Sequence, residues 1–257
     1  MAPVSLRSTF LVLVASAYAQ HPSTFNLPSR FSASDAGPPV PPTNPSTVSV
    51  LDFGAFGDAK TDNTDAFLRA LAAISDTGGI VIVPAGQYVI DGNLTIPDGV
   101  ALVGTYQAPP CHDLRVTAGV VEVDGSQLLP RGGRGDAGGP PFLTVLQSAS
   151  IKGFTIWYPD VDPSATPLPY PWTVSLAGRN AAIMDVELLN SFNGIYAVNS
   201  PRHYIARVYG QPTNVGVYVD ACHDIGRIEN VHFNPWYSNA PKCASAWSSK
   251  LDAILRS

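Results

Sequence analysis

Two acidic side chains, Asp185 and Glu187, stand two positions apart in the largely apolar stretch that begins at Ile183. Hydrolysis of a glycosidic bond uses such a pair: one carboxylic acid protonates the leaving oxygen, and one carboxylate activates water or attacks. In a regular strand, which rises about 3.3–3.4 Å per residue, the two backbone positions would lie about 7 Å apart. The spacing therefore nominates Asp185 and Glu187 as a catalytic pair.

Three further polar side chains follow in the next apolar segments. Arg207 and Tyr209 stand in the stretch that begins at Ile205, and His232 stands in the stretch that begins at Ile228. An arginine binds a carboxylate through two parallel hydrogen bonds. A uronate held in this way would suit β-elimination, in which a base removes the proton beside the uronate carboxyl. We predict that Arg207, Tyr209 and His232 bind substrate, and these residues leave hydrolysis and elimination open.

These segments belong to an internal repeat. The pattern Ile-x-x-Val/Phe begins at Ile151, Ile183, Ile205 and Ile228, with spacings of 32, 22 and 23 residues. A second series, Gly-Ile/Val-Tyr, begins at Gly194 and Gly216 and is again 22 residues apart. Short strands repeated at this period predict a solenoid, in which each coil buries its apolar side on its neighbours. We therefore expect an all-β fold, a single-stranded parallel β-helix, with chance similarity in a β-sandwich as the alternative.

Stacked coils would place equivalent residues above one another, about 4.8 Å apart. If the Ile and Val/Phe of each unit point inward, one outward column holds Gly153, Asp185, Arg207 and Asn230. The other outward column holds Thr155, Glu187, Tyr209 and His232. The alternative is an ordinary surface ion pair of Asp185 with Arg207 among solvated neighbours.

A separate outward column contains Tyr196 and Tyr218, with Asp220 beside them. Aromatic rings on an outer face suit flat sugar rings, although tyrosines also pack over a neighbouring coil. We predict that Tyr218 and Asp220 bind substrate, with coil packing as the alternative.

The chain before the repeat divides into a targeting segment, a leader and the start of the fold. Residues 1–19 combine Arg7, a short apolar core and a small-x-small site at 17–19, which predicts a signal peptide and a secreted, extracellular protein. Residues 20–47 are rich in proline and predict an extended leader. Ordered structure is expected to begin near Val48.

A helix and several strands are predicted next. Asp62, Asn63 and Thr64 offer N-cap oxygens to a helical period that closes at Gly78-Gly79. Short apolar runs then predict strands over 80–84, 87–90, 93–96 and 100–104. At the other end, residues 236–257 place Trp247, Leu251 and Ile254 at helical spacing. This tail is either a short capping helix or the end of a truncated product.

Several segments resemble the pectate-lyase-like superfamily, which includes rhamnogalacturonases and epimerase-like pectate lyases. They are LDFGAFGDAKTDNTDAF, GGIVIVPAGQYVI and LTIPDGVALVG, followed by GFTIWYPD and residues 170–235, which are similar to coils of family 28-related glycoside hydrolases. Over residues 48–235 the resemblance implies a right-handed β-helix with an N-terminal capping α-helix. It also implies action on pectin-like or other cell-wall polysaccharide.

The catalytic strings of polygalacturonases are not carried over to this chain. Those enzymes bear Asn-Thr-Asp, Asp-Asp, Gly-His-Gly and Arg-Ile-Lys on successive coils. Only Asn63-Thr64-Asp65 matches the first string, and it lies in the predicted helix, where capping explains it. Three or four clear coils are also fewer than relatives have.

Composition and charge exclude some classes of binding partner. A net charge of −5 with 15 Lys+Arg argues against nucleic acid, and no later segment is apolar enough to span a membrane. Three cysteines permit one disulfide, with Cys222 and Cys243 the closer pair, and Asn93 opens a glycosylation sequon. No metal motif or cofactor is expected, except calcium if the protein is a lyase. The oligomeric state is open.

The combined expectation is a secreted polysaccharide-active protein that hydrolyses or eliminates glycosidic bonds. Missing catalytic strings and a short coil stack keep a second class open, a non-catalytic carbohydrate-binding or structural β-solenoid. A truncated product without a stable fold is the third alternative.

Overall fold

The computed structural model describes residues 46–106, 116–117, 120–121, 125–162 and 165–234. The predicted signal peptide (1–19), most of the leader (20–47) and the tail (236–257) lie outside these residues, as do Cys111 and Cys243. The last two leader residues, Ser46 and Thr47, already belong to strand β1, so the first strand begins two residues before Val48.

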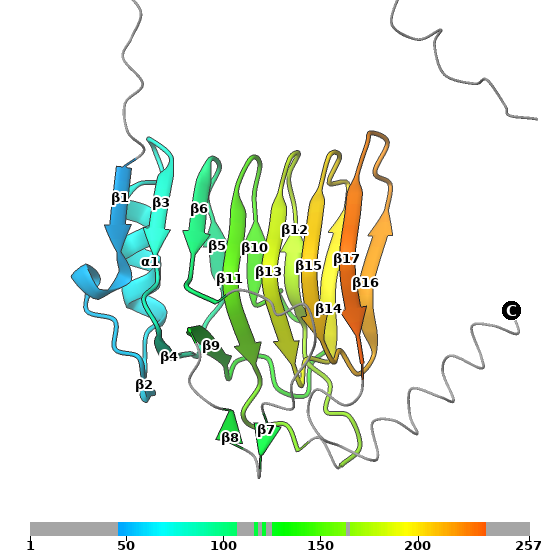
Figure 1. Ribbon diagram of the computed structural model, residues 1–257, viewed down its shortest axis with the longest axis horizontal. Helices are drawn as coiled ribbons and strands as arrows, with labels where there is room; N and C mark the ends of the chain where they lie inside the picture. The colour runs from blue at the N-terminus through cyan, green and yellow to red at the C-terminus, as the bar shows by residue number, and fades with distance from the viewer. Residues whose placement is uncertain (1–45, 107–115, 118–119, 122–124, 163–164, 235–257) are drawn as a thin grey trace, which may run out of the picture. The chain divides into compact units, whose positions relative to one another are not determined.

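The larger of two parallel sheets contains ten strands (Figure 1). Seven follow one another in the order β1 (Ser46–Ser49), β3 (Gly79–Ile82), β6 (Val100–Val103), β11 (Ser150–Trp157), β13 (Ala182–Leu189), β15 (Tyr204–Gly210) and β17 (Arg227–Phe233). The other three are β2 (Asp58–Asp62), β4 (Gly86–Ile90) and β9 (Ser126–Pro130), with β9 pairing to β11.

The smaller parallel sheet contains five strands. Its order is β16 (Val215–Asp220), β14 (Asn193–Val198), β12 (Trp172–Leu176), β10 (Leu143–Val145) and β5 (Leu94–Ile96). A short antiparallel pair, β7 (Val116–Thr117) with β8 (Val120–Val121), stands apart from both sheets. A 3-10 turn, η1 (Val50–Phe53), and one helix, α1 (Thr64–Ala73), complete the described elements.

From β10 onward the chain alternates strictly between the two sheets. Each strand pairs in parallel with the strand two further along, so Ile183 lies opposite Ile205, and Ile205 lies opposite Ile228. The registers reproduce the 22- and 23-residue spacings of the repeat. The predicted parallel solenoid is therefore confirmed as parallel strands in curled sheets, and the β-sandwich alternative, which needs antiparallel sheets, is wrong.

The repeated apolar residues form the core between the sheets. Ile151, Ile183 and Ile205 are fully buried, as are the matching Phe154, Val186 and Val208. Smaller-sheet residues such as Val174 and Ile195 join the same cluster. The predicted inward direction is thus confirmed for these units. On β17, the last described strand, Ile228 is largely exposed.

Helix α1 begins where expected and ends earlier. It buries Phe67 and Leu71 in the core cluster. Among the three predicted capping side chains, Asp62 accepts a hydrogen bond from the Thr64 amide at 3.0 Å. Asn63 turns away to accept from the Phe56 amide at 2.7 Å. The helix stops at Ala73, before Gly78-Gly79. Its role as a cap and the right-handed winding stay predictions.

No helix among the described residues is long and apolar enough to cross a membrane.

The turn before α1 is held by an acidic side chain. Asp58 accepts hydrogen bonds from the Thr61 amide at 2.8 Å, the Lys60 amide at 2.9 Å and the Thr61 hydroxyl at 2.8 Å. These bonds lower the pKa of Asp58 from 3.8 to about 2, and the bond from the Thr61 amide has the largest effect. A carboxyl with a lowered folded-state pKa stabilises the fold above its unfolded-state pKa, and this contribution disappears as the pH falls through the folded-state pKa.

We expect Asp58→Asn to flatten the pH dependence of the unfolding free energy between about pH 4 and pH 2, because the linked proton is gone. Denaturant unfolding at a series of pH values measures this slope. Thr61→Val, which removes only the hydroxyl bond, should flatten the slope less. A slope unchanged in Asp58→Asn would show that the turn is not linked to folding.

Candidate functional site

The larger sheet bends at the same position in successive coils. Gly153, Asp185, Arg207 and Asn230 all have left-handed backbones, with φ of 83°, 52°, 51° and 53°. The strand registers skip these positions and pair the residues on both sides of them. A left-handed φ disfavours non-glycine residues. The first predicted column is therefore confirmed as a stack of equivalent residues, but it is a column of bends.

The bend corrects the geometry expected for the carboxylate pair. The spacing of about 7 Å assumed a regular strand from Asp185 to Glu187. Asp185 interrupts that strand, so the estimate does not apply. Gly153 shows why the column lacks a side chain on its first coil, because a Cβ there would lie 2.6 Å from the Gly104 carbonyl oxygen.

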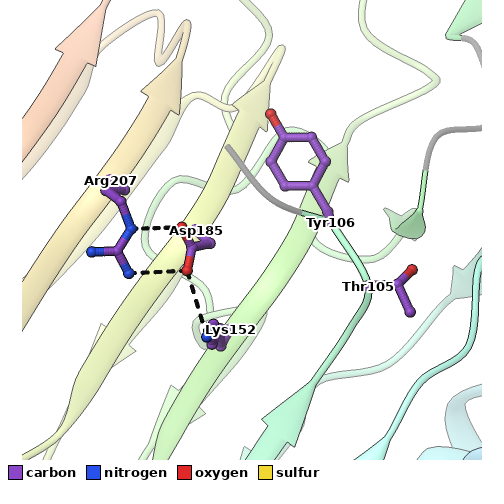
Figure 2. Close-up of a pocket in the computed structure, with 5 residues that line it drawn as sticks. All are labelled: Thr105, Tyr106, Lys152, Asp185 and Arg207. Carbon is purple, nitrogen blue, oxygen red and sulfur yellow. Dashed lines mark hydrogen bonds and ion pairs between the residues drawn. The ribbon is translucent and has the colours of Figure 1, made fainter. Parts of the chain in front are cut away.

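Asp185 and Arg207 form a two-pronged ion pair across neighbouring coils (Figure 2). Arg207 Nε donates to Asp185 Oδ1 at 2.6 Å, and Arg207 Nη2 donates to Oδ2 at 3.0 Å. Lys152 Nζ lies 3.9 Å from the same Oδ2. The hydrogen bonds to Asp185 raise the pKa of Arg207 far above its usual range, so the guanidinium stays charged.

These groups line a cavity of about 360 Å³, which we call the charged pocket. Its lining residues are Thr105, Tyr106, Lys152, Asp185 and Arg207. Figure 2 shows Arg207 and Lys152 converging on Asp185, with Tyr106 and Thr105 across the cavity. Asp185 is only 3% exposed, whereas about half of the Lys152 side chain is open to solvent. The pocket therefore carries two cations for one carboxylate.

Glu187 occupies the second predicted column. Strand pairing stacks Thr155, Glu187, Tyr209 and His232 in that order, as expected. Glu187 is only 1% exposed, and its Oε2 accepts a hydrogen bond from the Thr155 hydroxyl at 3.2 Å. Glu187 does not line the charged pocket. The two predicted catalytic carboxylates thus belong to neighbouring columns, and only Asp185 reaches this cavity.

The predicted binding residues are divided between the two sheets. Tyr209 lies on β15 and packs, half-buried, against Leu189, and His232 is exposed on β17. Tyr218 and Asp220 lie instead on β16 of the smaller sheet. The structure groups Arg207 with Asp185 but does not bring Tyr218 and Asp220 to the charged pocket.

Three lining residues of the charged pocket escaped the sequence analysis. Lys152 stands one position before the bend, in a column that continues to Val103 on one side and to Met184, Ala206 and Glu229 on the other. A charged side chain next to Gly153, in the first unit of the repeat, was the one sequence signal that could have identified Lys152 as a site residue. Thr105 and Tyr106 follow β6, outside the repeat, and no pattern in the sequence marks them.

The remaining predicted sites have little structural context. Asn93 is exposed immediately before β5. Cys222 is half-buried, with its Sγ 3.4 Å from the Ala197 carbonyl oxygen, and its predicted partner Cys243 lies outside the described residues. Within the described ranges, no group of three or more His, Cys, Asp or Glu is arranged to hold a metal ion.

Comparison with known proteins gives a family match over most of the chain. The model of the family described as rhamnogalacturonase A/epimerase, pectate lyase-like, matches residues 47–233. This range covers both sheets and the charged pocket.

Individual relatives match shorter stretches. Alginate lyase 7 of Azotobacter vinelandii is 45% identical over 56 residues, which are 21% of this chain and 6% of that protein. The tail spike protein of Shigella phage Sf6 is 34% identical over 83 residues, 30% of this chain and 13% of that protein. The chain therefore spans a small part of these relatives. The solved exopolygalacturonase of Thermotoga maritima has a TM-score of 0.45 at 20% identity, over 67% of this chain and 49% of that chain.

We expect Arg207→Gln to lower the unfolding free energy by about 1–3 kcal/mol, because it leaves the buried Asp185 carboxylate without its main partner. Asp185→Asn in the same chain should restore much of this loss, since asparagine tolerates a left-handed backbone and carries no charge. Denaturant unfolding of the two single variants and the double variant measures the coupling. Additive losses would show that the pair is energetically irrelevant.

Proposed function

The chain belongs to the rhamnogalacturonase A/epimerase, pectate lyase-like family, and from this membership we propose that it acts on a uronate-containing, pectin-like polysaccharide at the charged pocket. The observation that carries the proposal is the excess of positive charge there. Lys152 and Arg207 flank the single carboxylate of Asp185. A uronate carboxylate entering this pocket would balance the second cation.

The two cations have different roles in this proposal. Arg207 uses Nε and Nη2 on Asp185 and also interacts with the Tyr204 side chain, which leaves only part of its five N–H groups to a ligand. Lys152 is at 3.9 Å from Asp185, beyond hydrogen-bond distance, and half exposed. Its three N–H donors can therefore turn to an incoming carboxylate. Lys152 recruits the uronate, and Arg207 positions it beside Asp185.

Asp185 and Glu187 remain the proposed catalytic carboxylates. In hydrolysis one protonates the bridging oxygen as its bond to the anomeric carbon breaks, and the other takes a proton from the water that adds to that carbon. In elimination a base takes the proton beside the uronate carboxyl, the bond to the bridging oxygen breaks, a carbon–carbon double bond forms, and the leaving oxygen takes up a proton. Tyr209 and His232, in the column of Glu187, are proposed to contact substrate.

One observation favours the non-catalytic alternative, a carbohydrate-binding or structural solenoid. A general acid or base must come within hydrogen-bond reach of the reacting atoms. Asp185 has both oxygens engaged by Arg207, and Glu187 is 1% exposed with its bond to Thr155. Substrate must therefore displace existing contacts before either carboxyl can react, whereas binding to Lys152 requires no rearrangement.

The proposal includes the setting in which this chain works. We infer secretion through residues 1–19 and glycosylation at the exposed Asn93. We also infer right-handed winding, the hand that parallel crossover connections adopt almost without exception. Helix α1, whose Phe67 and Leu71 enter the core, would then cover the first coil.

The proposal is tested by incubating the protein with polygalacturonate, pectin and rhamnogalacturonan, with and without a calcium chelator. We expect new reducing ends, alone for hydrolysis and with ultraviolet-absorbing unsaturated ends for elimination. Asp185→Asn and Glu187→Gln should each lower turnover by about a hundredfold or more, as loss of an acid–base group does. Lys152→Gln should chiefly raise KM.

Asp136→Asn is the matched control, because Asp136 lies in an exposed turn and does not line the charged pocket. The turnover of this variant should equal that of the unsubstituted protein. Retention on polygalacturonate without any product would support the binding module over the enzyme. If no product forms and the protein is not retained on polygalacturonate, both the enzyme and the binding module are contradicted.

A further inference from the structure

The smaller sheet carries one unbroken row of hydroxyl groups, one from each of its five strands. Strand pairing places these residues directly opposite one another across β5, β10, β12, β14 and β16. We call the row the hydroxyl strip, and it consists of Thr95, Thr144, Ser175, Tyr196 and Tyr218. It runs across the strands, along the direction in which the coils are stacked.

The hydroxyl strip faces away from the core. On each of the first four strands, the residues on both sides of the strip are fully buried, as Leu94 and Ile96 are on β5 and Ile195 and Ala197 are on β14. Side chains alternate between the two faces of a strand. The hydroxyl-bearing residue between two buried neighbours must therefore point outward.

The strip is open to an external ligand at Thr95 and Tyr218, which are exposed, and in part at Thr144 and Tyr196, which are half-buried, whereas Ser175 is only 8% exposed. Within the part of the chain that the structure describes, no hydrogen bond engages the hydroxyls of Thr95, Thr144, Ser175 or Tyr196. That of Tyr218 has one long contact, 3.5 Å to Asp220 Oδ2. A hydroxyl both donates and accepts, and neighbouring strands are about 4.8 Å apart. The strip thus places one hydroxyl-bearing residue on every strand, with the Thr and Ser hydroxyls close to the sheet and the Tyr hydroxyls at the ends of their rings.

Aromatic rings gather at the β16 end of the strip. The rings of Tyr196 and Tyr218 stack with centroids 5.7 Å apart and planes at 9°. Trp172 packs beside both, 5.1 Å from Tyr196 and 6.3 Å from Tyr218. Tyr218 is still 45% exposed. Packing on one another accounts for part of these ring surfaces, and the exposed part of Tyr218 is an apolar platform beside the hydroxyls.

We propose that the hydroxyl strip binds a neutral polysaccharide laid along the stack of coils. Sugar rings offer apolar faces to the exposed Tyr218 and hydroxyls to the row of donor–acceptor groups. No cation belongs to the strip, and the carboxylate nearest to it, Asp220, would repel a polyuronate. The chemistry of the strip therefore differs from that of the charged pocket.

The two surfaces lie on different sheets, and the second does not depend on activity at the first. Figure 1 shows β5, β10, β12, β14 and β16 lying behind the larger sheet that carries Lys152, Asp185 and Arg207. A protein bound through the strip to a neutral polymer would keep the charged pocket near uronate chains in the same wall. Such tethering raises the local concentration of the second ligand without any new contact.

The test is affinity gel electrophoresis and calorimetric titration of the full chain with soluble β-glucan and galactan, with polygalacturonate run in parallel. We expect a neutral polymer to be bound, and Tyr218→Ala to weaken that binding about three- to tenfold. Thr144→Val, which keeps the shape and removes one hydroxyl, should weaken it about two- to fivefold. Phe56→Ala removes a more exposed aromatic ring, 61% exposed, away from the strip and should have no effect.

Any of three results would overturn the proposal. One is unchanged affinity for the neutral polymers in both Tyr218→Ala and Thr144→Val, with thermal unfolding showing that the variants are folded. The second is a dimer in analytical ultracentrifugation that Tyr218→Ala dissociates, with no binding of neutral polymer by the monomer, which would assign the strip to a second copy of this chain. Binding of polygalacturonate alone would also overturn it while leaving the charged pocket supported.

Discussion

Parallel pairing in constant register is the constraint on which this structure depends. Because β13, β15 and β17 come from units 22 or 23 residues apart, each paired residue lies opposite its equivalent in the next coil, as Ile183 does opposite Ile205. One apolar position repeated along the chain therefore becomes a continuous row in the core. The same register turns any repeated outward position into a row on the surface, and both candidate surfaces are such rows.

The repeated bend shows how the register shapes a site. At Asp185 and Arg207 the backbone is left-handed in both coils, so neither residue takes part in the ladder that pairs its neighbours. Their side chains leave the sheet at equivalent corners and meet as a two-pronged pair. The backbone strain at these two residues is offset by the ladder on either side and by the ion pair itself. The charged pair and the strained backbone thus occur at the same two residues, Asp185 and Arg207.

The features that follow from the periodicity of the sequence could be predicted from it, whereas the features that interrupt this periodicity could not. The spacing of Ile151, Ile183, Ile205 and Ile228 predicted the core row, and the alignment of the neighbouring columns followed from the same spacing. The left-handed bend was not predictable, because aspartate, arginine and asparagine have no common sequence signal for it. Lys152 was missed for a related reason, since it enters the charged pocket from a different column. The burial of Glu187 depends on contacts that a column argument does not contain.

Each strand has an inward face that packs in the core and an outward face that can vary. One solenoid can therefore carry a charged surface on one sheet and a neutral, hydroxyl-bearing surface on the other. Inward positions must stay apolar, because every coil covers the next, and Val186 and Val208 have no freedom to become polar. Outward positions are not held to one chemistry in this way, so the larger sheet carries charged residues at its bends while the smaller sheet carries hydroxyls along its length. Asp185 is the exception, since its burial and its left-handed backbone tie it to the stability of the coil. Substitution at the hydroxyl strip should therefore change binding with little effect on stability, whereas substitution at Asp185 changes both.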